Sequence, residues 1–317
     1  SANVPYEVTT LRRDVETDGR RATVSFTEDW AEDAQRRDFR MNALYATANG
    51  DVFDPTGGGL DDIAHRRIVF VGDAETRIRE DYLRILRFFR FYAWYGQGAP
   101  DAAGLAACAR LKAGLAVISA ERIWMETKKL LAAPDPMTSL QAMEAGGVLA
   151  QLFPKAKGLR LVEDLIALER SAGFAPDPMA RFLALFWKDA AAVHEAANAL
   201  KMSNEERQRL NWSAKNETLI QSDMSAKHMR RALYGVGEIV FRDRVLLQWA
   251  QDKSPAWSKV YSDAAAYVRP AMPVSGEDLL VHGIAEGPAI GEALRQLEAD
   301  WIDSDFTLGQ DELLARL

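Results

Sequence analysis

The 317-residue sequence contains a single cysteine, Cys108, and four histidines that are scattered along the chain. One cysteine excludes a disulfide within the chain and favours a reducing compartment, so we expect a cytoplasmic location. The histidines and the cysteine lack the paired spacing of a zinc site, and we expect no bound zinc. No apolar run approaches the roughly 20 residues of a membrane-spanning helix, so we expect no membrane partner.

The sequence has no excess of basic residues either. The net charge is −7, which is not typical of a nucleic-acid-binding protein. One window is an exception, because residues 77–90 hold five arginines against only two acids, Glu80 and Asp81. Any contact with RNA must therefore use local basic patches. The hydrophobic content of 48% is otherwise that of a globular protein, and the length allows more than one domain.

Residues 80–95 contain neither proline nor glycine, which predicts one unbroken helix. Apolar residues such as Leu83, Leu86 and Phe89 would give this helix a wide buried face. Charged residues interrupt that face at three-residue steps: Asp81, Arg84, Arg87 and Arg90. Residues three apart are neighbours on a helix, so Asp81 and Arg84 are expected side by side.

Such a pair offers one acceptor beside one forked donor. Asp81 would accept from the amino group of cytosine or adenine, while Arg84 would donate to the ring of the same base. Uracil and guanine reverse this pattern, and a good pairing between a side chain and a base discriminates by roughly 1–3 kcal/mol. The alternative for this spacing is a simple surface salt bridge, which is common and contributes little.

Four motifs occur in order along the first 131 residues: RRDFRMNAL at 36–44, DPTGG at 54–58, EDYLRILRFFRF at 80–91 and SAERIWMETKKLL at 119–131. Together they resemble motifs B to E of class II tRNA nucleotidyltransferases, the CCA-adding enzymes, and of the bacterial poly(A) polymerases that share their fold. The resemblance implies an enzyme that adds CMP and AMP from CTP and ATP to the tRNA 3′ end without a nucleic-acid template. Two alternatives remain: a poly(A) polymerase that accepts mainly ATP, and a non-catalytic helical RNA-binding module.

The resemblance also implies roles for the residues of the first motif. Arg37 would contact the nucleotide phosphates, and Asp38 and Asn42 would order the pocket around it. The family usually has Thr and Ile where this chain has Arg40 and Met41. Arg40 would either add positive charge near the site or point to water.

The third motif would select the nucleotide. Its charged residues are the nucleotide-binding candidates Asp81, Arg84, Arg87 and Arg90. The fourth motif would act as a structural brace for that helix through Glu121 and Arg122. The oligomeric state is not indicated by any pattern.

Nucleotidyl transfer needs carboxylates that hold Mg²⁺ ions. In the family a Gly-Gly motif and a D-x-D pair supply them, and neither precedes Pro5 here; the only D-x-D, at 303–305, follows no strand. Glu7 matches the apolar–acid–apolar form of the family's third catalytic acid, and it equally matches a solvent-facing residue of an edge strand. We therefore expect a metal site mostly outside this chain, and no Mg²⁺-dependent incorporation by the chain alone.

The predicted fold class is α+β, with the remainder of a nucleotidyltransferase head followed by a large helical part. Strands are expected at 5–11, 22–26, 51–53 and 67–71, and helices at 29–45, 80–95 and 102–113. The glycine run 57–59 is expected to form a hinge or tight turn without helix or strand. The predicted domains are a head at 1–72, a helical neck at 73–133, and an all-helical RNA-binding body and tail at 134–317.

Overall fold

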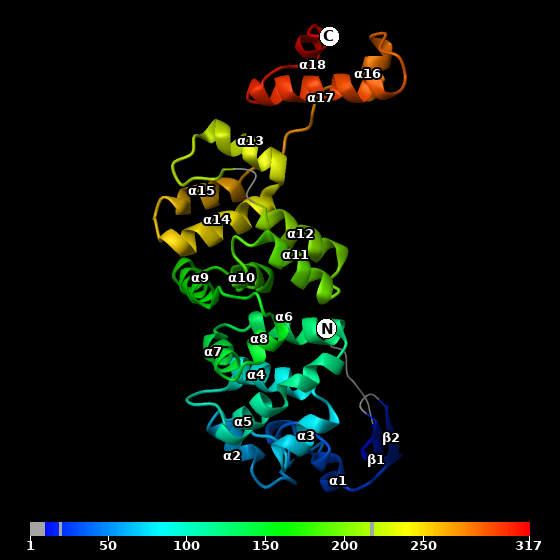
Figure 1. Ribbon diagram of the computed structural model, residues 1–317, viewed down its shortest axis with the longest axis vertical. Helices are drawn as coiled ribbons and strands as arrows, with labels where there is room; N and C mark the ends of the chain where they lie inside the picture. The colour runs from blue at the N-terminus through cyan, green and yellow to red at the C-terminus, as the bar shows by residue number, and fades with distance from the viewer. Residues whose placement is uncertain (1–9, 19–20, 216–218) are drawn as a thin grey trace. The chain divides into compact units, whose positions relative to one another are not determined.

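The computed structural model describes residues 10–18, 21–215 and 219–317, and most of these residues are helical (Figure 1). The chain divides into two compact units, residues 1–210 and residues 211–317. All four sequence motifs lie in the first unit. The three-part division into head, neck and body stays a prediction.

Two pairs of short strands form the β part of the described chain. β1 (Arg12–Asp18) pairs antiparallel with β2 (Arg21–Phe26), and β3 (Tyr45–Ala46) with β4 (Val52–Phe53). The strands near 22–26 and 51–53 and the α+β class are therefore confirmed, whereas β1 lies after the strand expected at 5–11. Residues 5–9 of the first expected strand, including Glu7, lie outside the described residues.

The strand expected at 67–71 is wrong. This segment makes one isolated antiparallel bridge, between Phe39 and Phe70, in place of a ladder. The amide of Arg40 donates to the carbonyl of Val69 (3.0 Å), and the amide of Val71 donates to the carbonyl of Asp38 (3.0 Å). The pairing ends there because the opposite segment turns into a short 3₁₀ helix directly after Phe39.

The single helix expected at 29–45 is also wrong. α1 (Trp30–Gln35) is followed by extended backbone at Phe39 and by the 3₁₀ helix η1 (Arg40–Asn42). The side chain of Asp38 accepts hydrogen bonds from the amide of Phe39 and from the side chain of Asn42. Local bonds of this kind compete with the helical ladder, which explains the break.

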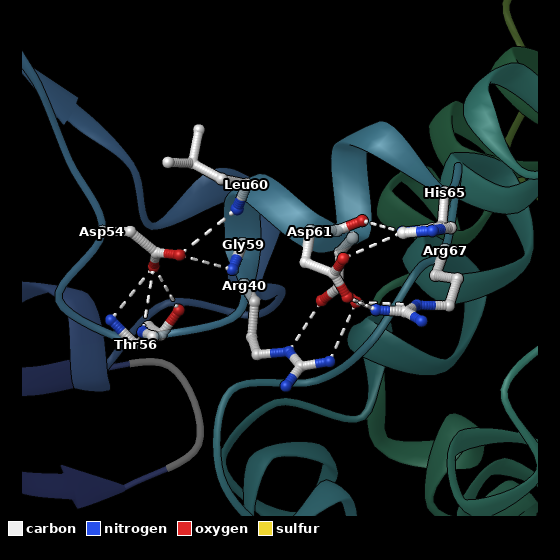
Figure 2. A network of polar contacts seen from close by, with 10 residues as sticks. Arg40, Asp54, Thr56, Gly59, Leu60, Asp61, His65 and Arg67 are labelled. Atoms are coloured by element: carbon white, nitrogen blue, oxygen red, sulfur yellow. Dashed lines mark hydrogen bonds and ion pairs between the residues drawn. The ribbon is translucent and has the colours of Figure 1, made fainter.

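The glycine run is partly helical, contrary to expectation. Gly57 has a φ of 71°, but α2 (Gly59–Ala64) begins only two residues later. The carboxylate of Asp54 accepts from the amides of Gly59 (2.7 Å) and Leu60 (3.2 Å), as Figure 2 shows. Asp54 thus satisfies two amides that the start of a helix leaves without partners, and this stabilises α2.

The helix expected at 80–95 is broken at its start. α3 (Ala74–Glu80) ends at Asp81, whose backbone is extended, and α4 (Leu83–Tyr95) begins two residues later. Asp81 accepts a hydrogen bond from the amide of Leu83 (3.1 Å), as an aspartate at a helix start commonly does. Asp81 and Arg84 are therefore not neighbours on one helix.

The apolar face of α4 forms the core of the first unit. Leu83, Ile85, Leu86, Phe88, Phe89 and Tyr92 are all buried. Phe88 stacks on Phe70 with ring centroids 5.5 Å apart, which joins α4 to the segment after α2. The buried face predicted for this segment is confirmed.

The remaining helices confirm the all-helical pattern from residue 134 within the described part of the chain. Those of the first unit that follow α4 are α5 (Ala102–Leu111), η2 (Lys112–Val117), α6 (Ala120–Leu131), α7 (Met137–Ala145), α8 (Val148–Leu152), α9 (Leu159–Ala172), α10 (Pro178–Leu185) and α11 (Ala190–Ala199). α12 (Asn204–Ala214) contains the boundary between the units. In the first unit Arg181 forms a fully buried ion pair with Glu169, with Nη2 and Oε2 2.5 Å apart.

The second unit packs around two apolar clusters, one containing Phe241 and Trp257 and the other Leu297 and Trp301. Its helices are α13 (Ala226–Val236), α14 (Glu238–Asp252), α15 (Trp257–Ala265), α16 (Gly276–Val281), α17 (Pro288–Asp303) and α18 (Gln310–Leu314). None of the described helices is both long and apolar enough to cross a membrane.

Candidate functional site

A cleft of about 530 Å³ lies in the first unit, where the segment from α1 to η1 faces the start of α4. Its walls are formed by Arg36, Arg37, Asp38, Asn42, Asp81, Leu83, Arg84, Arg87, Phe91 and Arg122. The fold thus brings together six of the predicted nucleotide-binding residues and one of the two predicted bracing residues. They come from three motifs that are up to 86 positions apart.

Asp38 is the centre of one polar network in this cleft. Its Oδ1 accepts from Asn42 Nδ2 at 3.0 Å, and its Oδ2 accepts from Arg87 Nε at 2.6 Å. Asp38 is 7% exposed, so these bonds are shielded from water and hold its carboxylate in one orientation. The network joins the η1 turn to α4.

Asp33 is the centre of a second network that the sequence reasoning missed. The carboxylate is completely buried and accepts from Arg36 Nε (2.8 Å), Arg37 Nη2 (2.9 Å) and Tyr45 Oη (2.6 Å). Burial alone would raise the pKa of Asp33, but the hydrogen bonds from Tyr45, Arg36, Arg37 and the amide of Arg12 outweigh it and hold the pKa far below its ordinary value. Asp33 therefore stays ionised and orients both arginines.

The spacing of Asp33 from Arg36 and Arg37 carried a signal for this network. The three residues are three and four positions apart, the separations at which side chains meet across one turn of a helix. Tyr45 gave no such signal. It reaches Asp33 only because the chain turns back after η1.

Both terminal nitrogens of the Arg84 guanidinium group donate hydrogen bonds to other groups of the protein. Nη1 donates to the carbonyl of Arg77 (2.8 Å) and to Glu80, and Nη2 donates to the carbonyl of Arg36 (2.9 Å). Its side chain is 14% exposed. Arg84 thus ties α3 and α4 to the end of α1 and forms part of the floor of the cleft.

Asp81 pairs with Arg122 of α6, with Oδ2 and Nη2 2.5 Å apart. The side-by-side Asp81 and Arg84 expected from the helical spacing are corrected by this finding, since Asp81 lies before α4 begins. Both groups still line the same cleft. Arg122 thus contacts the residue two positions before α4, and its bracing role stays a prediction.

Three candidates lie elsewhere. Arg90 pairs with the buried Glu126 of α6 (2.5 Å) and is not among the cleft residues. Glu121 is half-exposed and forms an ion pair with Lys201 (3.3 Å). Arg40 neither lines the cleft nor points to water, because it pairs with the buried Asp62 (2.7 Å).

Phe91 is an apolar member of the cleft that was assigned to the buried face from the sequence. It is half-buried, and the guanidinium carbons of Arg90 and Arg87 lie 4.2 Å and 5.4 Å from its ring centre. Both distances are within the range of cation–π contacts. Its ring therefore helps to position the basic side of α4.

The charges of the cleft favour an anionic ligand. Five arginines line it against two aspartates, and counting Asp33 and Glu80, which pair with three of those arginines from outside the lining, leaves an excess of one positive charge. Forked guanidinium groups match the geometry of phosphate oxygens. The described residues contain no group of three His, Cys, Asp or Glu side chains that would hold a metal ion, and Glu7 lies outside them.

A larger cavity of about 730 Å³ lies in the second unit. It is lined by residues such as Trp212, His228 and Arg231, and none of the four sequence motifs contributes to it. We therefore take the cleft of the first unit as the candidate site.

Comparison with known proteins shows to which family the chain belongs. Residues 1–69 match the family model described as the poly A polymerase head domain, and residues 101–159 match the one described as a probable RNA and SrmB-binding site of polymerase A. The mitochondrial CCA tRNA nucleotidyltransferase 1 of Mus musculus is 36% identical over 313 residues, covering 98% of this chain and 71% of the mouse protein. The chain belongs to the CCA tRNA nucleotidyltransferase family.

Bacterial members of the family are similar as well. The CCA-adding enzyme of Streptococcus sanguinis is 33% identical over 313 residues, which cover 95% of this chain and 76% of that protein. The solved structure of the Bacillus stearothermophilus CCA-adding enzyme in complex with CTP matches with a TM-score of 0.74 and 26% identity, covering 98% of this chain and 78% of that one. The Thermotoga maritima CCA-adding enzyme complexed with tRNA shares the fold, with a TM-score of 0.63 and 18% identity, over 96% of this chain and 80% of that one.

Proposed function

We propose that the cleft binds CTP and ATP, and that the protein adds CMP and AMP to the 3′ end of tRNA. One observation carries this proposal: residues of three family motifs converge on one basic cleft in a chain that belongs to the CCA tRNA nucleotidyltransferase family. The Bacillus stearothermophilus relative, whose fold this chain matches, was solved with CTP.

The lining of the cleft offers groups for both the phosphates and the base of a nucleotide. Arg36 and Arg37, oriented by the ionised Asp33, would bind phosphate oxygens. Asp81 and Arg84 present an acceptor and a donor to the pairing edge of a base. Selection by these two residues, with no nucleic-acid template, is the mechanism that we propose for the choice of cytosine and adenine.

This mechanism requires an exchange of partners. Asp81 now bonds to Arg122, and Arg84 now bonds to Glu80 and to two carbonyl groups. A base in the cleft would replace one partner of each, and the other contacts would hold both side chains in place. The bonds to Arg122 and Glu80 thus keep Asp81 and Arg84 oriented before the nucleotide arrives.

The tRNA is the proposed acceptor, and the helical segments from α5 onward are proposed to bind it. Within them, residues 101–159 match a family model described as a probable RNA-binding site. We also propose the division into head, neck and body at residues 72 and 133; the match of residues 1–69 to the head-domain model supports the first of these boundaries. The cytoplasmic location stays a prediction, and the mouse relative is mitochondrial by name.

Magnesium is the metal that the family implies. The described residues do not form a site for it, so we assign no step of the reaction to Mg²⁺ in this chain. Use of ATP alone, as in a poly(A) polymerase, is the competing activity. No observation favours it over the use of both nucleotides.

The test is nucleotide binding by the purified chain, measured by calorimetry with CTP and ATP separately. Both should bind, and Arg37→Ala should weaken both by about tenfold or more, since it removes a charge-assisted bond to phosphate. Arg160→Ala is the matched control, because Arg160 is an exposed arginine paired within α9. Failure of the parent chain to bind CTP would refute the proposal, and binding of ATP alone would favour the poly(A) polymerase activity.

A further inference from the structure

Arg40 stands where the sequence departs from the pattern of its family, and its side chain points away from the nucleotide cleft. Its Nε and Nη2 bond to Asp62 of α2 at 2.7 Å and 2.9 Å, a two-bond contact with a completely buried carboxylate. Arg67 adds a third bond to the same carboxylate at 3.1 Å. Figure 2 shows the guanidinium groups of Arg40 and Arg67 converging on the acidic side of α2.

The backbone of α2 approaches Arg40 so closely that only glycine fits. A Cβ atom on Gly59 would lie 2.5 Å from the carbonyl oxygen of Arg40, and one on Gly58 would lie 2.6 Å from its Nη1. The first contact is with backbone and cannot be relieved by a change of rotamer. The glycine run and Arg40 therefore form one close-packed joint.

A capping side chain also fixes the start of α2. Asp54 caps the first turn through the amides of Gly59 and Leu60 and also accepts from the side chain of Thr56 (2.8 Å). Burial would raise the pKa of Asp54, but the hydrogen bonds from Thr56 and these amides outweigh it and lower the pKa. Asp54 thus fixes the part of α2 that packs against Arg40.

Arg40 belongs to the same short turn as two cleft residues. Asp38 lies two positions before it and Asn42 two positions after it; Asp38 accepts from the side chain of Asn42 and from Arg87 of α4. The backbone of Arg40 and Asp38 is also fixed by the bonds to Val69 and Val71. A shift of the Arg40 backbone must therefore move Asp38 relative to α4.

We propose that the Arg40–Asp62 pair positions Asp38 and Asn42 for nucleotide binding by anchoring their turn to α2. Arg40 is a positioning residue, which touches no nucleotide and acts through Asp38. The inference rests on the proposed function, because the nucleotide in the cleft is CTP or ATP. The inference predicts that Arg40, Asp62 and Gly59 affect the affinity for nucleotide although none of them lines the cleft.

The first test compares two buried acids of the same chemistry. Asp62→Asn removes the charge that Arg40 binds, and Glu169→Gln removes the charge that Arg181 binds in a part of the first unit that does not line the cleft. Both variants should lower the temperature of unfolding. At a temperature where each is fully folded, CTP should bind about tenfold more weakly to Asp62→Asn, whereas Glu169→Gln should bind as the parent does.

A second set of variants keeps the test decisive if Asp62→Asn does not fold. Gly59→Ala leaves the ion pair chemically intact but forces the Arg40 carbonyl to move, and it should weaken CTP binding in the same way. Arg40→Lys, which keeps the charge, should recover part of the affinity lost in Arg40→Gln. Folded variants that bind CTP like the parent would refute the positioning role, whereas a parent that does not bind CTP would refute the proposed function itself.

Discussion

The Nη2 of Arg84 donates to the carbonyl oxygen of Arg36 at 2.9 Å, across 48 positions of the sequence. The same guanidinium group donates to the carbonyl of Arg77, one turn before Asp81. Three segments of the cleft therefore meet at one side chain. A charged donor bonded to buried carbonyl groups also keeps a fixed direction, which a residue that reads a base requires.

Replacement of Arg84 by alanine should weaken the binding of CTP and ATP alike. One guanidinium group serves both bases in the proposed reading, and its loss also releases the end of α1 beside Arg36 and Arg37. Calorimetric titration should show a loss of about tenfold or more for each nucleotide. Arg84→Lys keeps the charge but lacks the forked donors of a guanidinium group. It should therefore restore only a part of the affinity that Arg84→Ala loses. A variant that lost affinity for one nucleotide alone would indicate two separate pockets.

Much of the fold could be predicted because it depends on long periodic patterns. The buried face of residues 83–92 and the helices from residue 134 follow from the regular spacing of apolar residues. The errors fall at short polar segments. Asp38 and Asp81 each bond to a nearby amide and break a helix that their neighbours favour, a local competition that apolar periodicity does not register.

The members of the site were easier to predict than their partners. Arg37, Asp38 and Arg84 all line the cleft, as the ordered motifs indicate. The ion pairs join segments that are distant in the sequence, however, and the sequence does not indicate which arginine pairs with which carboxylate. Arg40 shows this best, since its partner Asp62 lies 22 positions away on a helix where only a glycine turn was expected.

The carboxylate of Asp33 should stabilise the fold in a pH-dependent way. Its pKa in the folded chain lies far below the ordinary value of 3.8 because of its four hydrogen-bond donors, although burial opposes this. The stabilisation is therefore complete above the pKa of the unfolded chain and is lost as the pH falls through the lower pKa of the folded chain. Asp33→Asn should cost about 1.5–3 kcal/mol at neutral pH.

Urea unfolding at a series of pH values measures this effect. The difference in unfolding free energy between parent and Asp33→Asn should be constant from about pH 8 to pH 5 and should shrink below about pH 4. Asp263→Asn is the control, because Asp263 forms only an exposed ion pair with Lys259 and should show little difference at any pH. A difference for Asp33→Asn that grew as the pH fell would contradict the argument.

The choice between cytosine and uracil should depend on Asp81. In the proposed mechanism the carboxylate of Asp81 would accept from the amino group of cytosine and would repel the O4 carbonyl of uracil. In Asp81→Asn the amide can turn its NH₂ group toward that carbonyl, while N3–H of uracil remains poorly matched. Binding of UTP should therefore improve only in part. Binding of CTP should weaken by about 1–3 kcal/mol, since a charge-assisted bond becomes a neutral one.

The contact between Asp81 and Arg122 supplies the matched control for this prediction. Arg122→Gln breaks the same ion pair but leaves the carboxylate of Asp81 in the cleft. The dissociation constants of CTP and UTP should be measured for the parent chain, Asp81→Asn and Arg122→Gln. We expect the ratio of CTP affinity to UTP affinity to fall in Asp81→Asn and to stay near the parent value in Arg122→Gln. If both variants change the ratio equally, Asp81 acts only as the partner of Arg122, and base selection must be assigned to other residues of the cleft.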